Sequence, residues 1–266
     1  MKKFLMLMLT LALAVTTLAG CGQNANNTAS TGASQVKGLL NQGELSIGVD
    51  DSFPPMEFRD ENNNLVGFDV DLANEIGKKL GVKIKWVPTD WNGILLSLNS
   101  KKFDIVLSSL SITDERKKQI TFSDSYFDIN QVIAVKNGNT SIKSSADLKG
   151  KAVGCQLGTT GDDAASKLTG LKELKKYDKA TEAFHDLTIG RLDAVIIDSP
   201  VAGYYSKKGG GFSVLDEKLT KEPIGIGFRQ GNTDLQQAVQ KAIDELKKDG
   251  TLSKLSVKWF GVDEYK

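Results

Sequence analysis

The sequence contains an arginine and an aspartate whose positions after apolar segments suit them to bind a small charged molecule. Arg116 follows the apolar residues 103–107 and a serine-rich turn, so its planar guanidinium can reach a cleft and hold a carboxylate through two hydrogen bonds. Asp198 follows the apolar residues 195–197, and a carboxylate at the end of a parallel strand points into the crevice where such sheets bind ligands. A guanidinium and a carboxylate facing one gap would bind the two charges of a zwitterion.

Each of these residues also has a structural interpretation. Arg116 could be a surface arginine on the polar segment 114–118, and Asp198 could cap the helix that follows it. A third candidate is the turn Gly158-Thr159-Thr160-Gly161, where backbone N–H groups at the start of a helix favour an anion. The hydroxyl of Thr159 or Thr160 could equally cap that helix.

Cysteine, histidine and metal chemistry is not indicated. Cys155 ends the apolar residues 152–155 and is interpreted as a buried, inert thiol, because apolar surroundings favour that role over a nucleophile. His185 is the only histidine and has no Cys or His partner at metal-ligand spacing, so it is interpreted as an ordinary helix residue. We therefore predict no metal site and no cofactor.

Strands and helices alternate along the chain. Apolar periodicity predicts strands over 44–49, 82–87 and 103–107 with helices over 69–80 and 92–101. This order indicates a largely parallel sheet with helices on both faces. The pattern then restarts, with strands over 131–135, 151–156, 192–197 and 224–228, and helices beginning at 146 and covering 158–168, 181–190, 233–248 and 252–259.

Two successive α/β units predict an α/β protein of two lobes, each with its own mostly parallel sheet. We expect lobe 1 to comprise residues 38–126 and 226–266, and lobe 2 to comprise residues 130–221. The chain would cross between the lobes at 126–130 and 222–225, and two extended crossovers make a natural hinge. The cleft between the lobes is where a ligand is expected.

The first residues are interpreted as a targeting segment. Lys2 and Lys3 precede an apolar stretch over 4–19 that is too short to span a membrane comfortably. The stretch ends in Leu18-Ala19-Gly20-Cys21, which resembles the bacterial lipobox, so residues 1–20 are predicted to be a lipoprotein signal peptide and Cys21 the lipidated residue. A plain signal peptide and an uncleaved anchor are the alternatives.

Residues 21–37 are rich in Asn, Thr, Ser, Ala and Gly and are predicted to be a flexible tether. We expect the mature protein to be held at the outer face of the cell membrane by lipid on Cys21, without a later spanning segment. Removing Lys2 and Lys3 with the leader leaves 32 basic and 33 acidic residues, a balance that argues against a nucleic-acid partner.

Four motifs together connect the chain with a known family. They are residues 49–55 (Val-Asp-Asp-Ser-Phe-Pro-Pro), 66–72 (Val-Gly-Phe-Asp-Val-Asp-Leu), 108–116 (from Ser-Ser-Leu-Ser to Glu-Arg), and 249–251 with 258–260. In this order the sequence resembles the polar amino acid-binding proteins of bacterial ABC importers, which include lysine/arginine/ornithine-, histidine-, glutamine- and cystine-binding proteins. The resemblance implies a two-lobe, type II periplasmic-binding-protein fold, a free amino acid as ligand, an ABC permease as partner, a monomer and no enzymatic activity.

The resemblance also assigns roles to residues of the cleft. Asp198 would pair with the α-ammonium of the ligand, helped by the Ser111 hydroxyl and the Ser109 carbonyl. Aromatic walls would come from Phe53 and Trp91, with Asp50 and Gln156 near the far end of the ligand side chain. The complete set of predicted ligand residues is Asp50, Phe53, Trp91, Ser108, Ser109, Ser111, Arg116, Gln156, Thr159, Thr160 and Asp198.

The predicted ligand is a basic amino acid, arginine or lysine. The charge of Asp50 and the π-faces of Trp91 and Phe53 attract a guanidinium or ammonium. Glutamine and cystine remain alternatives, because an Asp can also accept from an amide and Gln156 adds no charge. A different class would be a dehydratase of prephenate or arogenate on the same fold, with Glu57 or Asp162 as its acid.

Overall fold

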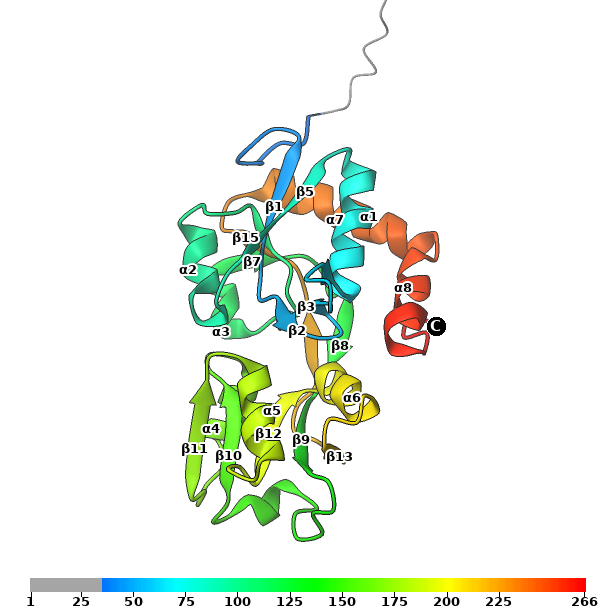
Figure 1. Cartoon of the computed structure of the whole chain (residues 1–266). Coiled ribbons are helices and arrows are strands. Elements are labelled where there is room, and N and C mark those ends of the chain that lie inside the picture. Colours follow the sequence, from blue (N-terminus) through cyan, green and yellow to red (C-terminus); the bar gives the residue numbers. More distant parts are fainter. Residues whose placement is uncertain (1–34) are drawn as a thin grey trace, which may run out of the picture. The chain divides into compact units, whose positions relative to one another are not determined.

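The computed structural model describes residues 35–266; the predicted signal peptide, Cys21 and nearly all of the predicted tether lie outside the described residues. A first five-stranded sheet has the order β5-β1-β6-β15-β7 (Figure 1). Its strands are β1 (Glu44–Val49), β5 (Lys83–Pro88), β6 (Ile105–Val106), β7 (Ile120–Phe122) and β15 (Gly227–Arg229). β1 is parallel to β5 and β6, whereas β15 is antiparallel to β6 and β7.

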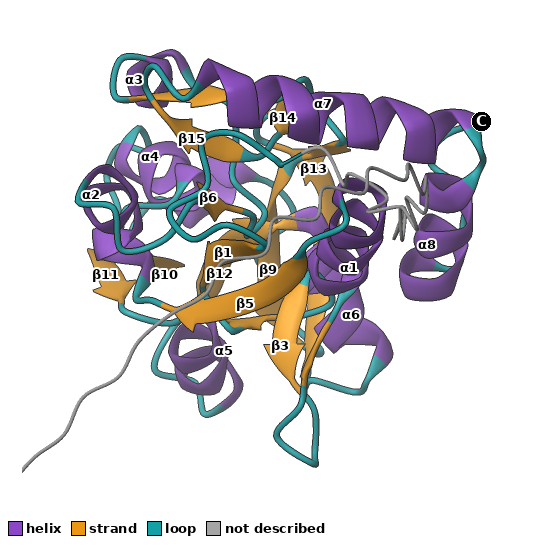
Figure 2. Cartoon of the chain, turned by 90° about the horizontal axis from the view of Figure 1, so that it is seen from above, coloured by secondary structure: helices purple, strands orange, loops and turns teal. Residues whose placement is uncertain are grey.

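Several helices are associated with the first sheet, and the longer ones among them bury apolar residues against the core. They are α1 (Phe68–Leu80), η1 (Trp91–Gly93), α2 (Ile94–Asn99), α3 (Asp114–Lys117), α7 (Thr233–Lys248) and α8 (Thr251–Phe260). In α1 the residues Leu72, Ala73 and Ile76 are buried at helical spacing, and the helix packs against both α7 and α8 (Figure 2). α1 ends at Gly81, whose left-handed φ of +67° favours glycine.

A second five-stranded sheet has the order β11-β10-β12-β9-β13. Its strands are β9 (Gln131–Lys136), β10 (Ala152–Gln156), β11 (Glu173–Tyr177), β12 (Ala194–Asp198) and β13 (Phe212–Lys218). The associated helices are η2 (Ser145–Leu148), α4 (Thr160–Ser166), α5 (Ala180–Thr188) and α6 (Ser199–Lys207). Every residue of β10 and β12 is buried, as expected for strands covered on both faces.

The chain passes between the two sheets twice. The first passage is β8 (Phe127–Ile129), between β7 and β9, and the second is β14 (Glu222–Ile224), between β13 and β15. These two short strands pair with each other in antiparallel fashion. A separate small sheet is formed by β2 (Ser52–Phe53), β3 (Glu57–Arg59) and β4 (Leu65–Val66), just after β1.

The α/β class and most predicted elements are confirmed, with two corrections. Both large sheets are mixed, because β15, β9 and β13 run antiparallel to their neighbours. The strand predicted over 224–228 is divided: Ile224 belongs to β14 and Gly227 to β15. Cys155 is fully buried in β10 and burial raises its pKa to about 12, in agreement with an inert thiol. Within residues 35–266, no helix has the length and apolarity needed to cross a bilayer.

Candidate functional site

A small cavity lies between the parts of the chain that carry the two large sheets, and its empty space, including the part open to solvent, is about 290 Å³. All eleven predicted ligand residues line it, and Glu57 completes the lining: Asp50, Phe53, Glu57, Trp91, Ser108, Ser109, Ser111, Arg116, Gln156, Thr159, Thr160 and Asp198. Many of them follow or end a strand, as Asp50 does after β1 and Asp198 does in β12, so the carboxyl ends of the strands supply the polar groups. Their contact with a ligand stays a prediction.

Arg116 is buried at the cavity, with 9% of its surface exposed, so the surface interpretation of this arginine is wrong. Its Nη1 donates to the carbonyl of Ser111 at 3.0 Å and its Nη2 donates to the carbonyl of Gly158 at 3.3 Å. The guanidinium carbon lies 5.3 Å from the ring centroid of Trp91, within cation–π distance. A guanidinium has five N–H donors, so these two bonds leave donors for a carboxylate.

Asp198 ends β12 and precedes α6, yet its side chain makes no capping hydrogen bond to that helix. Instead, Oδ1 accepts from the amide of Gln131 at 2.6 Å and Oδ2 accepts weakly from the hydroxyl of Ser109 at 3.4 Å. Burial raises the pKa of Asp198 to about 7, although the Gln131 hydrogen bond and the charge of Arg116 act in the opposite direction. Among residues 35–266, neither Arg116 nor Asp198 takes part in a salt bridge.

The aromatic and serine residues connect the two sheets across the cavity. The indole Nε1 of Trp91 donates to the Gly158 carbonyl at 3.0 Å, and the hydroxyls of Ser111 and Thr160 lie 3.3 Å apart. Ser109 has a φ of +46°, an unusual left-handed conformation for a residue with a side chain. With that conformation its N–H donates to Asp69 while its hydroxyl reaches Asp198.

In the turn at 158–161 one of the predicted N–H groups is engaged by the protein itself, and anion binding by this turn stays a prediction. The N–H of Gly158 donates to Asp162 at 3.1 Å, and the carbonyl of Gly158 is what faces Arg116 and Trp91. The Thr159 hydroxyl caps α4 by accepting from the N–H of Asp162. The capping interpretation is therefore confirmed for Thr159, which also lines the cavity.

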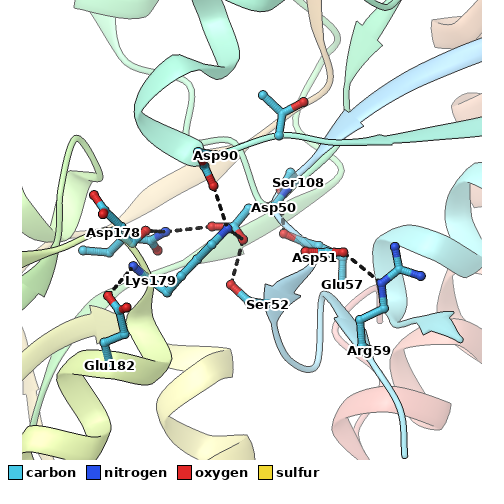
Figure 3. A network of polar contacts seen from close by, with 12 residues as sticks. Asp50, Asp51, Ser52, Glu57, Arg59, Asp90, Ser108, Asp178, Lys179 and Glu182 are labelled. Atoms are coloured by element: carbon cyan, nitrogen blue, oxygen red, sulfur yellow. Dashed lines mark hydrogen bonds and ion pairs between the residues drawn. The ribbon is translucent and has the colours of Figure 1, made fainter. Parts of the chain in front are cut away.

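Asp50 follows β1 and lines the cavity, and it contacts residues that belong to both parts of the molecule, among them Ser52 and Lys179 (Figure 3). Its Oδ1 accepts from the hydroxyl of Ser52 at 2.7 Å and from Nζ of Lys179 at 2.9 Å. Its Oδ2 accepts from the amide of Gln156 at 2.7 Å. Sequence reasoning missed Lys179, because it stands in a polar run rich in lysine and no spacing relates it to Asp50.

A pair of buried acids lies beside the cavity. Glu57 accepts from the Ser108 hydroxyl at 2.7 Å, and Asp69 accepts from the Tyr126 hydroxyl at 2.9 Å. Burial, reinforced by the charge of Asp69, holds the pKa of Glu57 well above its ordinary value, and burial raises the pKa of Asp69 to about 6. Oε2 of Glu57 has no partner if both carboxyls are ionised, whereas a proton on Glu57 can be donated to Asp69. Burial therefore favours the neutral form of Glu57 beside Asp69; sequence reasoning named Glu57 but missed Asp69.

Comparison with known proteins agrees with this geometry. The model of the bacterial extracellular solute-binding proteins, family 3, matches residues 45–262. The L-cystine-binding protein of Escherichia coli K12 is 39% identical over 233 residues, which cover 85% of this chain and 88% of the relative.

Two solved structures are similar throughout. An ancestral arginine-binding protein bound to arginine has a TM-score of 0.79 and 49% identity, over 82% of this chain and 99% of that one. An ancestral arginine-binding protein bound to glutamine has a TM-score of 0.79 and 48% identity, over 83% and 99%. The neighbours have the type II periplasmic-binding-protein fold, which confirms the predicted fold, and the family is extracytoplasmic. The chain belongs to the bacterial extracellular solute-binding proteins, family 3, and is a solute-binding protein for amino acids.

Proposed function

We propose that the protein captures a free basic amino acid, foremost arginine, and delivers it as a monomer to the permease of an ABC importer. The observation that carries this proposal is the pair Arg116 and Asp198. Arg116 lies in α3, which is associated with the first sheet, and Asp198 ends β12 of the second sheet. The two residues carry opposite charges and line one cavity. A zwitterion placed between them would neutralise both.

The α-carboxylate of the ligand is assigned to Arg116. Its guanidinium is fixed by two backbone carbonyls and by Trp91, which leaves a preorganised fork for bidentate binding. The α-ammonium is assigned to Asp198, a buried acid whose raised pKa reflects the lack of a directly bound cation. An ammonium beside it would restore the ionised form.

The side chain of the ligand is assigned to the space between Phe53, Trp91, Glu57 and Asp50. Of the ionisable residues that line the cavity, three are acids and Arg116 is the base. After the α-groups are paired with Arg116 and Asp198, Asp50 remains for a cationic side chain, because burial raises the pKa of Glu57 well above its ordinary value and favours its neutral form. Relatives with arginine bound support this choice.

Glutamine is the second candidate ligand, and a specific observation favours it. Asp50 is already paired with Lys179 and Gln156, so part of its negative charge is neutralised before a ligand enters. A similar ancestral protein has been solved with glutamine. Cystine, the ligand in the name of the E. coli relative, is a third candidate.

Delivery would depend on closure of the two predicted lobes, residues 38–126 with 226–266 and residues 130–221, about β8 and β14. A ligand that touches both Arg116 and Asp198 binds the closed arrangement better than the open one, so it shifts the equilibrium toward closure. The permease would then distinguish the closed form. We further propose that lipid on Cys21 holds the protein at the outer face of the membrane, with residues 21–37 as the tether.

A dehydratase on the same fold is the competing class. That chemistry needs an acid in contact with the substrate, and Glu57 is the protonated acid in the lining of this cavity, whereas Asp162 is engaged by Gly158, Ser166 and Lys176. The relatives named above are binding proteins, which favours capture without turnover. Measurable consumption of prephenate or arogenate would support the enzyme instead.

The experiment is a thermal-shift panel followed by calorimetry with arginine, lysine, ornithine, histidine, glutamine and cystine. A ligand that binds only the folded protein raises its melting temperature. We expect arginine to give the largest shift, and Arg116→Ala to weaken its binding by about 2–5 kcal/mol, or roughly 30- to 4,000-fold. Glu115→Ala, on the exposed side of α3, is the matched control. No shift with any amino acid, or equal binding by Arg116→Ala, would contradict the proposal.

A further inference from the structure

Lys179 places a positive charge against Asp50, which lines the part of the cavity where the ligand side chain is expected. It occupies the N-cap position of α5, and its Nζ lies 2.9 Å from Oδ1 of Asp50 and 3.5 Å from Oδ1 of Asp90. Figure 3 shows the Lys179 side chain pointing toward Asp50 and Asp90. The Asp50 side chain is only 2% exposed, whereas that of Lys179 is 26% exposed. The carboxylate of this ion pair is therefore shielded from water, and electrostatic interactions are stronger in such a buried environment than in water.

The hydrogen-bonding capacity of Asp50 is nearly used up by the protein itself. A carboxylate offers about four lone-pair sites. Ser52, Lys179 and Gln156 occupy three of these sites on Asp50. A guanidinium needs two sites for a bidentate bond, so it can bind Asp50 fully only if Lys179 or Gln156 withdraws.

We propose that Lys179 is a specificity-determining residue, an internal cation that occupies Asp50 and reduces the preference of the cavity for cationic over uncharged side chains. This inference rests on the proposed function, because it assumes that an amino acid side chain points toward Asp50. With Lys179 in place, an amide such as that of glutamine meets a neutralised end of the cavity. A guanidinium meets a like charge and an occupied acid.

The size of the effect follows from Coulomb's law. At an effective dielectric of about 20, the repulsion between two unit charges about 12 Å apart changes a binding constant by about tenfold. A shorter separation changes it more. Removing the charge of Lys179 should therefore increase arginine affinity relative to glutamine affinity by about tenfold or more. The ion pair of Lys179 and Asp50 also joins the two predicted lobes, so it contributes to the free energy of closure. This contribution is the same for both ligands and cancels in the ratio of their Kd values.

The test compares Kd values for arginine and glutamine by calorimetry at one ionic strength in the wild-type protein and three variants. Lys179→Met removes the charge at similar length, Lys179→Arg keeps it, and Lys172→Met removes an exposed lysine that is remote from the cavity lining. We expect Lys179→Met to shift the ratio about tenfold toward arginine. We expect Lys179→Arg and Lys172→Met to leave the ratio within about twofold of the wild type.

An unchanged ratio of the two Kd values in Lys179→Met overturns the inference while the proposed function stands. This outcome includes equal weakening of both ligands, which a purely structural ion pair would give. A shift toward glutamine overturns it as well. Failure of the wild-type protein to bind either amino acid overturns the proposed function and, with it, this inference.

Discussion

Replacing Glu57 with glutamine should abolish much of the pH dependence of stability above pH 6. Glu57 is fully buried, accepts from Ser108 and stands beside Asp69, and burial raises its pKa, so we expect the folded protein to hold one proton between the two acids. A glutamine at this position can accept from Ser108 with its oxygen and donate to Asp69 with its amide. It therefore reproduces the protonated glutamate without a titratable proton.

The magnitude follows from proton linkage. Burial and Asp69 raise the pKa of Glu57 well above its ordinary 4.5, so the folded protein keeps a proton that the unfolded chain loses. A raised pKa contributes stability at low pH that is lost as pH rises. While one proton separates the two states, the free energy of unfolding falls by up to about 1.4 kcal/mol per pH unit, and this fall ends once the pH exceeds the pKa of Glu57 in the folded protein.

The assay is urea unfolding at pH 6, 7 and 8 for the wild-type protein and Glu57→Gln. The wild type should lose more stability than the variant across this range, by up to about 1.4 kcal/mol for each pH unit over which Glu57 keeps its proton in the folded protein. Asp69, whose pKa is raised to about 6, and Asp198 titrate in both proteins, so their contributions largely cancel in the comparison. Glu61→Gln, on an exposed loop, is the control and should follow the wild type. Parallel pH profiles for the wild type and Glu57→Gln would refute the shared proton.

Three further predictions concern the cavity and the core. Burial raises the pKa of Asp198 to about 7, and the ligand ammonium needs the ionised form of this acid, so ligand affinity should fall by up to about tenfold per pH unit below pH 7. Calorimetry should show proton release on binding, and Asp198→Asn should bind weakly without this pH dependence. A flat pH profile of affinity in the wild type would contradict the assignment. Gly158→Ala should lower stability by about 1 kcal/mol in thermal unfolding, since Gly158 has a φ of +74°; unchanged stability would show that the turn relaxes easily. Cys155 should resist thiol reagents until the protein unfolds, because burial raises its pKa to about 12, and rapid labelling of the native protein would contradict this.

The cavity lining was largely predictable because short motifs supplied it. Asp50, Ser109 and Arg116 stand in segments whose order and spacing resemble known binding proteins, and these segments follow strands that apolar periodicity also predicts. Lys179 was not predictable in the same way. Its contact with Asp50 joins residues 129 positions apart through a long flexible side chain, and no local pattern encodes such a contact.

The protonation of Glu57 and the shorter strands also required the structure. Whether an acid keeps its proton depends on burial and on a neighbouring acid, here Asp69, and both are properties of tertiary packing. β11 was missed because its sequence, Glu-Leu-Lys-Lys-Tyr, is that of a sheet-edge strand with polar residues on its exposed positions. The short β2–β4 sheet was missed because each of its strands has only two or three residues.

The position of β15 in the first sheet constrains the order in which the chain can fold. β15 (Gly227–Arg229) lies between β6 and β7, which precede it by more than a hundred residues. Until this late segment has been synthesised, Ile105 and Val106 keep an open edge and the sheet cannot be completed. The sheet of the amino-terminal half is therefore completed only when a segment from the carboxyl-terminal part adds β15 between β6 and β7.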